Sequence, residues 1–146
     1  MAWRPLIATL ALAPMVFPIA LAFAQGTAPT GTANAGSLGT ILVDQNGMTL
    51  YTLSADQPGV STCTGGCANA WPPALVDAAT AATLPPDGHL GTLARSDGTG
   101  LELTWDGMPL YRFVRDTAPG DVNGNGVNAF GGTWLVVPAE IGRAHV

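Results

Sequence analysis

The chain contains no lysine, and histidine and cysteine occur only twice each. Two of its five basic residues lie near its ends, so residues 25–140 set three arginines against ten acidic residues, a formal net charge near −7. Such a surface repels phosphate backbones and anionic lipid headgroups. A glycine-rich phosphate loop and a nucleotide fingerprint are also absent from the sequence. We therefore expect no nucleic-acid partner and no cofactor.

The scarcity of histidine limits catalysis. His145 lies in residues 141–146, which resemble the translation of a sequencing adapter and are set aside as a scar. His89 is then the base on which a Ser-His-Asp or Cys-His arrangement would be built. It follows two turn-forming residues and is expected to face solvent. The scattered acidic residues show no spacing typical of paired catalytic carboxylates. We therefore expect no enzymatic activity.

The beginning of the chain has the pattern of a secretion signal. Residues 1–24 combine Arg4, an apolar run and small residues ahead of a cleavage point after Ala24. Two prolines interrupt the run, which is also short for a membrane span, so no stable membrane insertion is expected after cleavage. The cleavage point has no cysteine that could carry a lipid anchor. The pattern predicts a secreted or periplasmic protein of a bacterium.

The rest of the chain divides into a leader and one domain. Residues 25–36 are small, polar and rich in glycine and threonine, which predicts a flexible leader. Residues 37–138 suffice for one compact core of modest stability. A repeat divides this domain into residues of about 37–86 and 87–138, because GMTLYTLSAD recurs as GMPLYRFVRD. Two diverged copies of one unit are expected.

Each copy of the repeat carries a tyrosine followed five positions later by an aspartate. The motif residues are Tyr51 and Asp56 in the first copy, Tyr111 and Asp116 in the second, with Trp71 corresponding to Trp134. Five residues of extended chain separate α-carbons by about 16 Å, so a tyrosine touches its own aspartate only if the chain reverses. We expect a structural motif, in which each tyrosine packs with a hydroxyl hydrogen bond and each aspartate starts a turn.

Alternating apolar residues and turn signals predict a mainly β fold. The expected strands are 38–44, 48–54, 90–95, 101–105, 108–114 and 133–137, and the expected helix is 76–83. Asn46-Gly47 and Asp106-Gly107 tolerate the positive φ of two-residue hairpin turns, and Asp97-Gly98 indicates a third hairpin. We expect two meander-like hairpin repeats packed as one small sandwich or barrel, with at most one short helix. The halves should share one core, because a lone hairpin is too weak.

The two cysteines, Cys63 and Cys67, predict a disulfide, because close pairs in an oxidising compartment usually bridge. A loop this short would contribute about 2 kcal/mol. An exchangeable redox pair and a metal site remain alternatives. Copper ligation could draw on Met48, Met108 and His89, although the place of both methionines at the start of hairpin strands is more typical of core residues.

The stretch DVNGNGVNAFGG resembles the opening of a calcium loop at Asp121, Asn123 and Asn125. Gly132 stands where the bidentate glutamate of such a loop belongs. A structural loop is favoured, and these three residues remain weak metal candidates.

Several motifs in order resemble a known family over residues 37–138. They are LVDQNGMTLYTLSAD, STCTGGCANAWPP, RSDGTGLELTWDGMPLYRFVRD, PGDVNGNG and GGTWLVV. They are similar to bacterial secreted proteins and predicted lipoproteins that carry a tandem repeat with a Y-x4-D motif. The resemblance implies secretion and supplies no catalytic residues. Our hypothesis is a non-catalytic envelope module, binding or structural, with an unknown envelope or extracellular partner. The alternative is a periplasmic redox or metal-handling protein.

Overall fold

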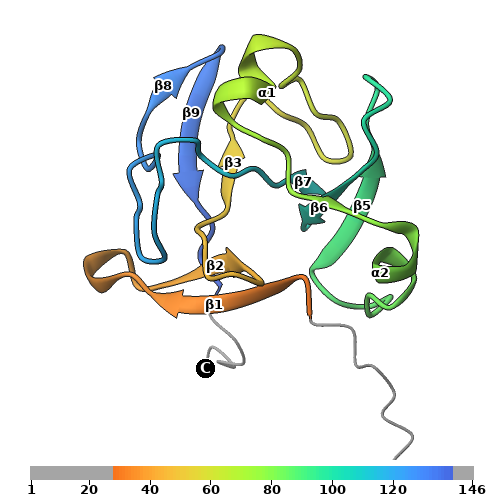
Figure 1. The fold of residues 1–146 in the computed structure, drawn as a ribbon, viewed down its shortest axis with the longest axis horizontal. Helices are drawn as coiled ribbons and strands as arrows, with labels where there is room; N and C mark the ends of the chain where they lie inside the picture. Colours follow the sequence, from red (N-terminus) through yellow and green to blue (C-terminus); the bar gives the residue numbers. More distant parts are fainter. Residues whose placement is uncertain (1–27, 140–146) are drawn as a thin grey trace, which may run out of the picture.

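The computed structural model describes residues 28–139 and shows a mainly β domain (Figure 1). Nine strands form three antiparallel sheets in a small sandwich-like arrangement that does not close into a barrel. Within the described residues, helices are too short to cross a membrane. The predictions for residues 1–24 and 141–146 lie outside the described residues.

The predicted strands and helix are present: β6 has the expected bounds, β9 begins and ends one residue earlier, and the other elements are shorter than expected. The strands are β1 Thr30–Asn34, β2 Thr40–Asp44, β3 Tyr51–Leu53, β4 Leu75–Val76, β5 Leu90–Ala94, β6 Leu101–Trp105, β7 Met108–Pro109, β8 Asn128–Ala129 and β9 Gly132–Val136. The helices are α1 Gly66–Ala70 and α2 Ala78–Ala82, with a 3-10 turn at Gly36–Leu38. Helix α2 begins after Asp77, whose carboxylate accepts a hydrogen bond from the Thr80 backbone amide and caps the helix.

Two predictions need correction. Part of the expected flexible leader, residues 30–34, forms β1 and pairs along the whole of β2. The sequence TGTAN conceals this strand because it has few apolar residues and is only partly buried. The structure also has a second short helix, α1, where at most one was expected. Helix propensity missed α1 because it begins with glycines, which disfavour helices.

The turns agree with the sequence in one hairpin and differ in another. Asp106 and Gly107 have φ of 50° and 84° and join β6 to β7 as the expected two-residue turn. In the first hairpin only Gly47 has positive φ. The amide of Gly47 donates to the Asp44 carbonyl, and the Asp44 carboxylate accepts from the amide of Met48. This loop is therefore longer than the two residues expected.

The last strand of each repeat joins the other repeat. Strand β9 of the second repeat pairs with β3 of the first, and β4 of the first pairs with β6 of the second. Figure 1 shows β3 near the middle of the molecule with β9 alongside it. Each repeat therefore lacks a strand that only the other repeat supplies, and the expected shared core is formed by this exchange.

The exchange follows the same register in both directions. Tyr51 lies opposite Val136, and Tyr111 forms a bridge with Pro73. In each case the partner stands two positions after the repeat's tryptophan. The two tyrosines also exchange backbone hydrogen bonds of 2.8 and 3.0 Å with each other. The halves are therefore related by an approximate two-fold axis that passes between Tyr51 and Tyr111.

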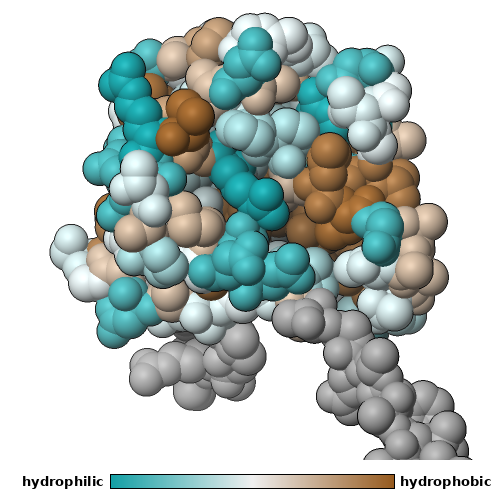
Figure 2. Space-filling model, viewed as in Figure 1, coloured by the Kyte–Doolittle hydropathy of each residue, from teal (hydrophilic) through white to brown (hydrophobic). Residues whose placement is uncertain are grey.

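The core has two parts. One is aliphatic and consists of Leu42, Leu50, Ala74, Leu103, Leu110, Val137 and Ala139. The other is aromatic and consists of Tyr51, Leu53, Cys63, Cys67, Trp71, Tyr111 and Trp134. On the surface, Figure 2 shows an apolar patch in the region of β6, β7 and α2, on a face that is otherwise mostly polar. The aromatic part contains all the motif residues except the aspartates.

Candidate functional site

The tyrosines and aspartates of the repeat motif pair across the two repeats. The hydroxyl of Tyr51 donates to Asp116 Oδ2 at 2.6 Å, and the hydroxyl of Tyr111 donates to Asp56 Oδ2 at 2.6 Å. All four side chains are at most 8% exposed. The expected hydroxyl hydrogen bond is present, and its acceptor is the aspartate of the other copy.

Each aspartate uses its second oxygen to fix its own exit loop. Asp56 Oδ1 accepts from the amide and the hydroxyl of Thr62, and Asp116 Oδ1 accepts from the amide of Asn123. These bonds agree with the expected role of the aspartates in turns. Both oxygens of each aspartate therefore accept hydrogen bonds from other groups of the domain.

Each tyrosine hydroxyl also has a second contact. The amide of Gly124 donates to the Tyr51 hydroxyl at 3.2 Å, and Ser61 Oγ lies 2.5 Å from the Tyr111 hydroxyl. Burial, together with the hydrogen bond to an aspartate, raises the pKa of both tyrosines well above its ordinary value. The hydroxyls therefore keep their protons and act as donors.

The tryptophans form a stack against this pair of tyrosines. Trp71 stacks on Trp134, with ring centroids 3.9 Å apart, and on Phe113, with centroids 4.1 Å apart. Tyr51 meets Trp71 edge-on, and Tyr111 meets Trp134 edge-on. Both geometries are favourable for aromatic pairs. The expected correspondence of the two tryptophans thus takes the form of direct contact at the two-fold axis.

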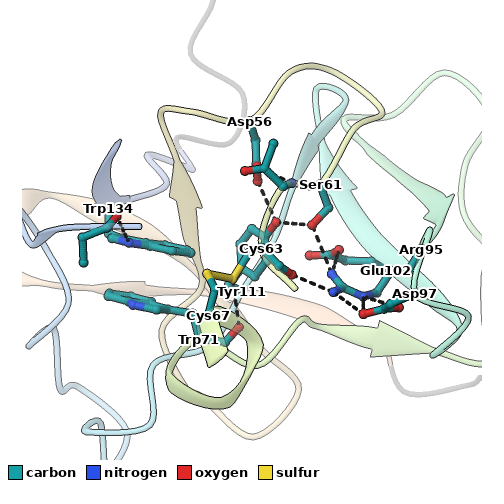
Figure 3. Close-up of a disulfide and its surroundings, with 12 residues drawn as sticks. Asp56, Ser61, Cys63, Cys67, Trp71, Arg95, Asp97, Glu102, Tyr111 and Trp134 are labelled. Atoms are coloured by element: carbon teal, nitrogen blue, oxygen red, sulfur yellow. Dashed lines mark hydrogen bonds and ion pairs between the residues drawn. A yellow bond between two sulfur atoms is a disulfide. The ribbon is translucent and has the colours of Figure 1, made fainter. Parts of the chain in front are cut away.

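The disulfide lies beside the stack (Figure 3). Cys63 and Cys67 are bonded with α-carbons 5.2 Å apart, as predicted, and are 0% and 6% exposed. Cys67 belongs to α1, which leads directly into Trp71. The bridge therefore fixes the loop that delivers the first tryptophan to the aromatic core.

An ionic network centred on the buried Arg95 adjoins Tyr111 (Figure 3). Arg95 donates to Glu102 Oε1 and to Asp97 Oδ2, both at 2.7 Å. It also donates to Ser61 Oγ at 3.1 Å and to the Cys63 carbonyl at 2.7 Å. One guanidinium thus joins the disulfide loop of the first repeat to the β5–β6 hairpin of the second.

Glu102 is the most deeply buried member of this network. Its side chain is fully buried, and its Oε2 has no hydrogen-bond partner among the described residues. Burial raises the pKa of Glu102 to about 7, although the bond to Arg95 acts in the opposite direction. The hydrogen bonds from Arg95 and Thr99 instead lower the pKa of Asp97. Asp97 is therefore the carboxylate that balances the arginine at acidic pH.

The sequence did not reveal the Arg95–Glu102 pair as a site. Both residue types normally lie at the surface, and each stands at an ordinary strand or hairpin position. The one available signal was the repeat itself. Glu102 pairs with Leu75, and the corresponding pair of the other copy is Ile41 and Pro138, so Glu102 takes the place of an isoleucine. A charged residue at a core position of one copy indicates a buried partner.

His89 lies on the surface and pairs with Asp106. Its Nδ1 is 2.6 Å from Asp106 Oδ1, and its ring stacks on Trp105 with centroids 4.7 Å apart. Both members of the pair are exposed. Its imidazole forms no hydrogen bond with a serine or cysteine side chain of the described residues. The structure thus places His89 where it was expected, facing solvent.

The remaining metal candidates serve the fold. Asp121 Oδ2 accepts from the amides of Thr117 and Ala118, which lower its pKa, and Asn125 Oδ1 accepts from the amide of Val136. The backbone amide of Asn123 donates a hydrogen bond to Asp116 Oδ1. Within residues 28–139, histidine, cysteine and acidic side chains form no cluster of three or more that would hold a metal ion. Met48 and Met108 are half-buried at their hairpins.

An open groove of about 660 Å³ lies where the two repeats meet. Ala70 and Trp71 of the first repeat line it, together with Phe113, Val114, Arg115 and Val127 of the second. This groove was not predicted from the sequence, because its walls come from segments far apart in the chain.

One family model matches the chain twice, over residues 31–75 and 91–138. Its description is a secreted repeat of unknown function. The first match begins within β1, so the family unit includes the strand that was expected to be leader. No curated protein and no solved structure matches the chain.

Proposed function

We propose that this chain, which belongs to the family of secreted repeats of unknown function, is a non-catalytic binding module of the bacterial envelope or extracellular space. In this proposal the repeat motif maintains the fold of the described domain. Binding is assigned to the outer surface.

One observation carries this proposal. The polar groups of the Tyr-x4-Asp motif are buried, and each tyrosine is bonded to the aspartate of the other repeat. A catalytic acid or base must reach the proton that it transfers. Side chains that point into the centre of the domain and already have partners are suited to holding two repeats together.

The groove at the repeat junction is the surface best suited to a ligand. Its volume of about 660 Å³ lies in the range typical of ligand sites, and its walls are mainly apolar with a few polar groups. The redox alternative is less well supported. A thiolate must reach a sulfur to exchange a disulfide, and both sulfurs belong to buried cysteines.

Binding to envelope material tests the proposal. Fluorescently labelled protein is titrated with envelope fractions of the source organism, and unlabelled protein is the competitor. We expect saturable, competable binding without chemical change in the fraction. A Tyr111→Phe variant that remains folded by near-ultraviolet circular dichroism should bind equally well, because the hydroxyl serves the fold. Failure to saturate, or release of soluble products from the fraction, would contradict the proposal.

A further inference from the structure

The groove has an aromatic platform at one end of the ring stack. Trp71 is covered on one face by Trp134 and on the other by Phe113. Phe113 is the outer ring of the stack and is only partly buried. Val114 beside it is 59% exposed. The groove therefore offers a rigid apolar surface that needs little reorganisation to receive a ligand.

The groove also carries a cation without an acidic partner. Arg95 is paired with Glu102 and Asp97, and Arg112 Nε lies 2.8 Å from Asp44 Oδ2. Among the arginines of residues 28–139, only Arg115 forms no ion pair, and it lines the groove. In a domain with a large excess of carboxylates, a lone exposed cation marks the place where an anion is tolerated.

The repeat shows that the fold alone does not require these side chains. The backbone amide of Val114 donates to Ala70, and the equivalent amide of Ser54 donates to Thr133. The backbone is thus bonded in the same way in both copies. However, the first copy has Leu-Ser-Ala at residues 53–55, where the second has Phe-Val-Arg at 113–115. An exposed valine and an arginine replace a serine and an alanine on the side of the groove.

We propose that this groove binds a small carboxylate with an apolar body, whose carboxylate pairs with Arg115 and whose body lies on Phe113 and Val114. The assignment rests on the proposed binding function and names the ligand chemistry of that site. Arginine binds carboxylates through two parallel N–H groups, which gives selectivity for this anion over neutral analogues.

Two probes of the same shape test the charge requirement. We use 2-naphthoate and its neutral analogue 2-naphthamide, and measure affinity by titration calorimetry and the binding position by amide chemical shifts. The carboxylate is expected to bind at least about tenfold more tightly, because hydrogen bonds to charged groups contribute more than neutral ones. Its affinity should fall with added salt, since the arginine is exposed.

Three surface variants separate the contributions. Arg115→Gln should abolish the preference for 2-naphthoate and leave 2-naphthamide unchanged. Val114→Ser, which restores the residue of the other repeat, should weaken both probes severalfold. Leu135→Ser is the matched control, because Leu135 is 47% exposed on β9 and does not line the groove. It should change neither affinity.

The possible outcomes distinguish a wrong ligand assignment from a wrong proposed function. Equal affinities for the two probes, an unaltered preference in Arg115→Gln, or shifts confined to residues outside the groove would overturn the assignment. If saturable envelope binding persisted in that case, the binding function would stand with another ligand. If envelope binding itself were missing, the proposed function would fail first.

Discussion

The hydroxyl of Tyr51 is bonded to Asp116 of the other repeat, at 2.6 Å, and not to Asp56 of its own motif. Tyr111 and Asp56 make the reciprocal bond at the same distance. Two copies of one short motif therefore form two crossed bonds, and each bond needs both repeats in place.

Tyr51→Phe should lower the free energy of unfolding by about 1–3 kcal/mol, because it leaves Asp116 Oδ2 and the buried Gly124 amide without this partner. Urea denaturation measures the change. Combining Tyr51→Phe with Asp116→Asn should give a non-additive cost, whereas combining it with Asp56→Asn should be close to additive. Equal coupling in both double variants would show that the bonds are not crossed.

Alkaline titration should detect the buried tyrosines, which are the two tyrosines of the chain. Their pKa is raised in the folded state by burial and by the bonds to aspartates, so the stability they confer is complete below pH 10 and falls as the pH rises beyond it. Absorbance at about 295 nm should show no tyrosinate at about pH 10, whereas the chain unfolded in guanidinium titrates there. Ionisation of the folded protein near pH 10 would refute the buried pairs.

Glu102 should make the protein less stable as the pH rises from about 4.5 to about 7. In that window the folded state retains a proton that the unfolded chain has released, because burial raises the pKa of Glu102 to about 7. Raising the pH therefore lowers the free energy of unfolding, by an amount on the order of 1–3 kcal/mol.

The Glu102→Gln variant should lose this component when urea midpoints are compared at pH 5 and pH 8. Asp97→Asn is the control, since the lowered pKa of Asp97 confers stability that is lost only on acidification below about pH 4. An identical pH dependence in the wild type and Glu102→Gln would be evidence against proton retention.

The disulfide should resist reduction in the folded protein, because Cys63 and Cys67 are buried. Thiol titration after treatment with dithiothreitol should detect no thiols under native conditions and two in denaturant. Replacing both cysteines by alanine should cost about 2 kcal/mol in the loop-entropy model. Rapid native reduction would revive the redox hypothesis.

Gly124→Ala should disrupt the contact between the repeats. A Cβ at this position would lie 2.7 Å from a Trp71 ring atom and 2.9 Å from the Tyr51 ring, and the stack leaves no room for either to move. We expect a loss of about 1–3 kcal/mol in thermal or urea unfolding. Gly66→Ala is the matched control, because a Cβ there meets nothing within 4 Å. A tolerated Gly124→Ala would mean that the stack is looser than observed.

The sequence predicted what depends on local pattern. Alternation located β6 at its observed bounds, Asp106-Gly107 marked a true two-residue turn, and Cys63 and Cys67 form the expected bridge. These features depend on residues close together in the chain. The two cysteines of the disulfide are only four positions apart in the chain.

The missed features depend on pairing between distant segments. Nothing in the alternation of residues 132–136 indicates that β9 joins the other repeat, so the crossed tyrosine bonds could not be foreseen. Strand β1 was missed because its stability comes from its partner β2 and not from apolar residues of its own. The groove was missed for the same reason, since its aromatic floor combines Trp71 of the first repeat with Phe113 of the second.

The strand exchange makes each half of the molecule the missing partner of the other. Strands β4 and β9 complete sheets on the far side of the two-fold axis, so the halves are related as two subunits of an intertwined dimer are. The connecting segment between them, which includes α2, turns what would be a concentration-dependent association into an encounter within one chain. For a member of a family of secreted repeats this matters, since dilution cannot separate partners that are covalently tethered.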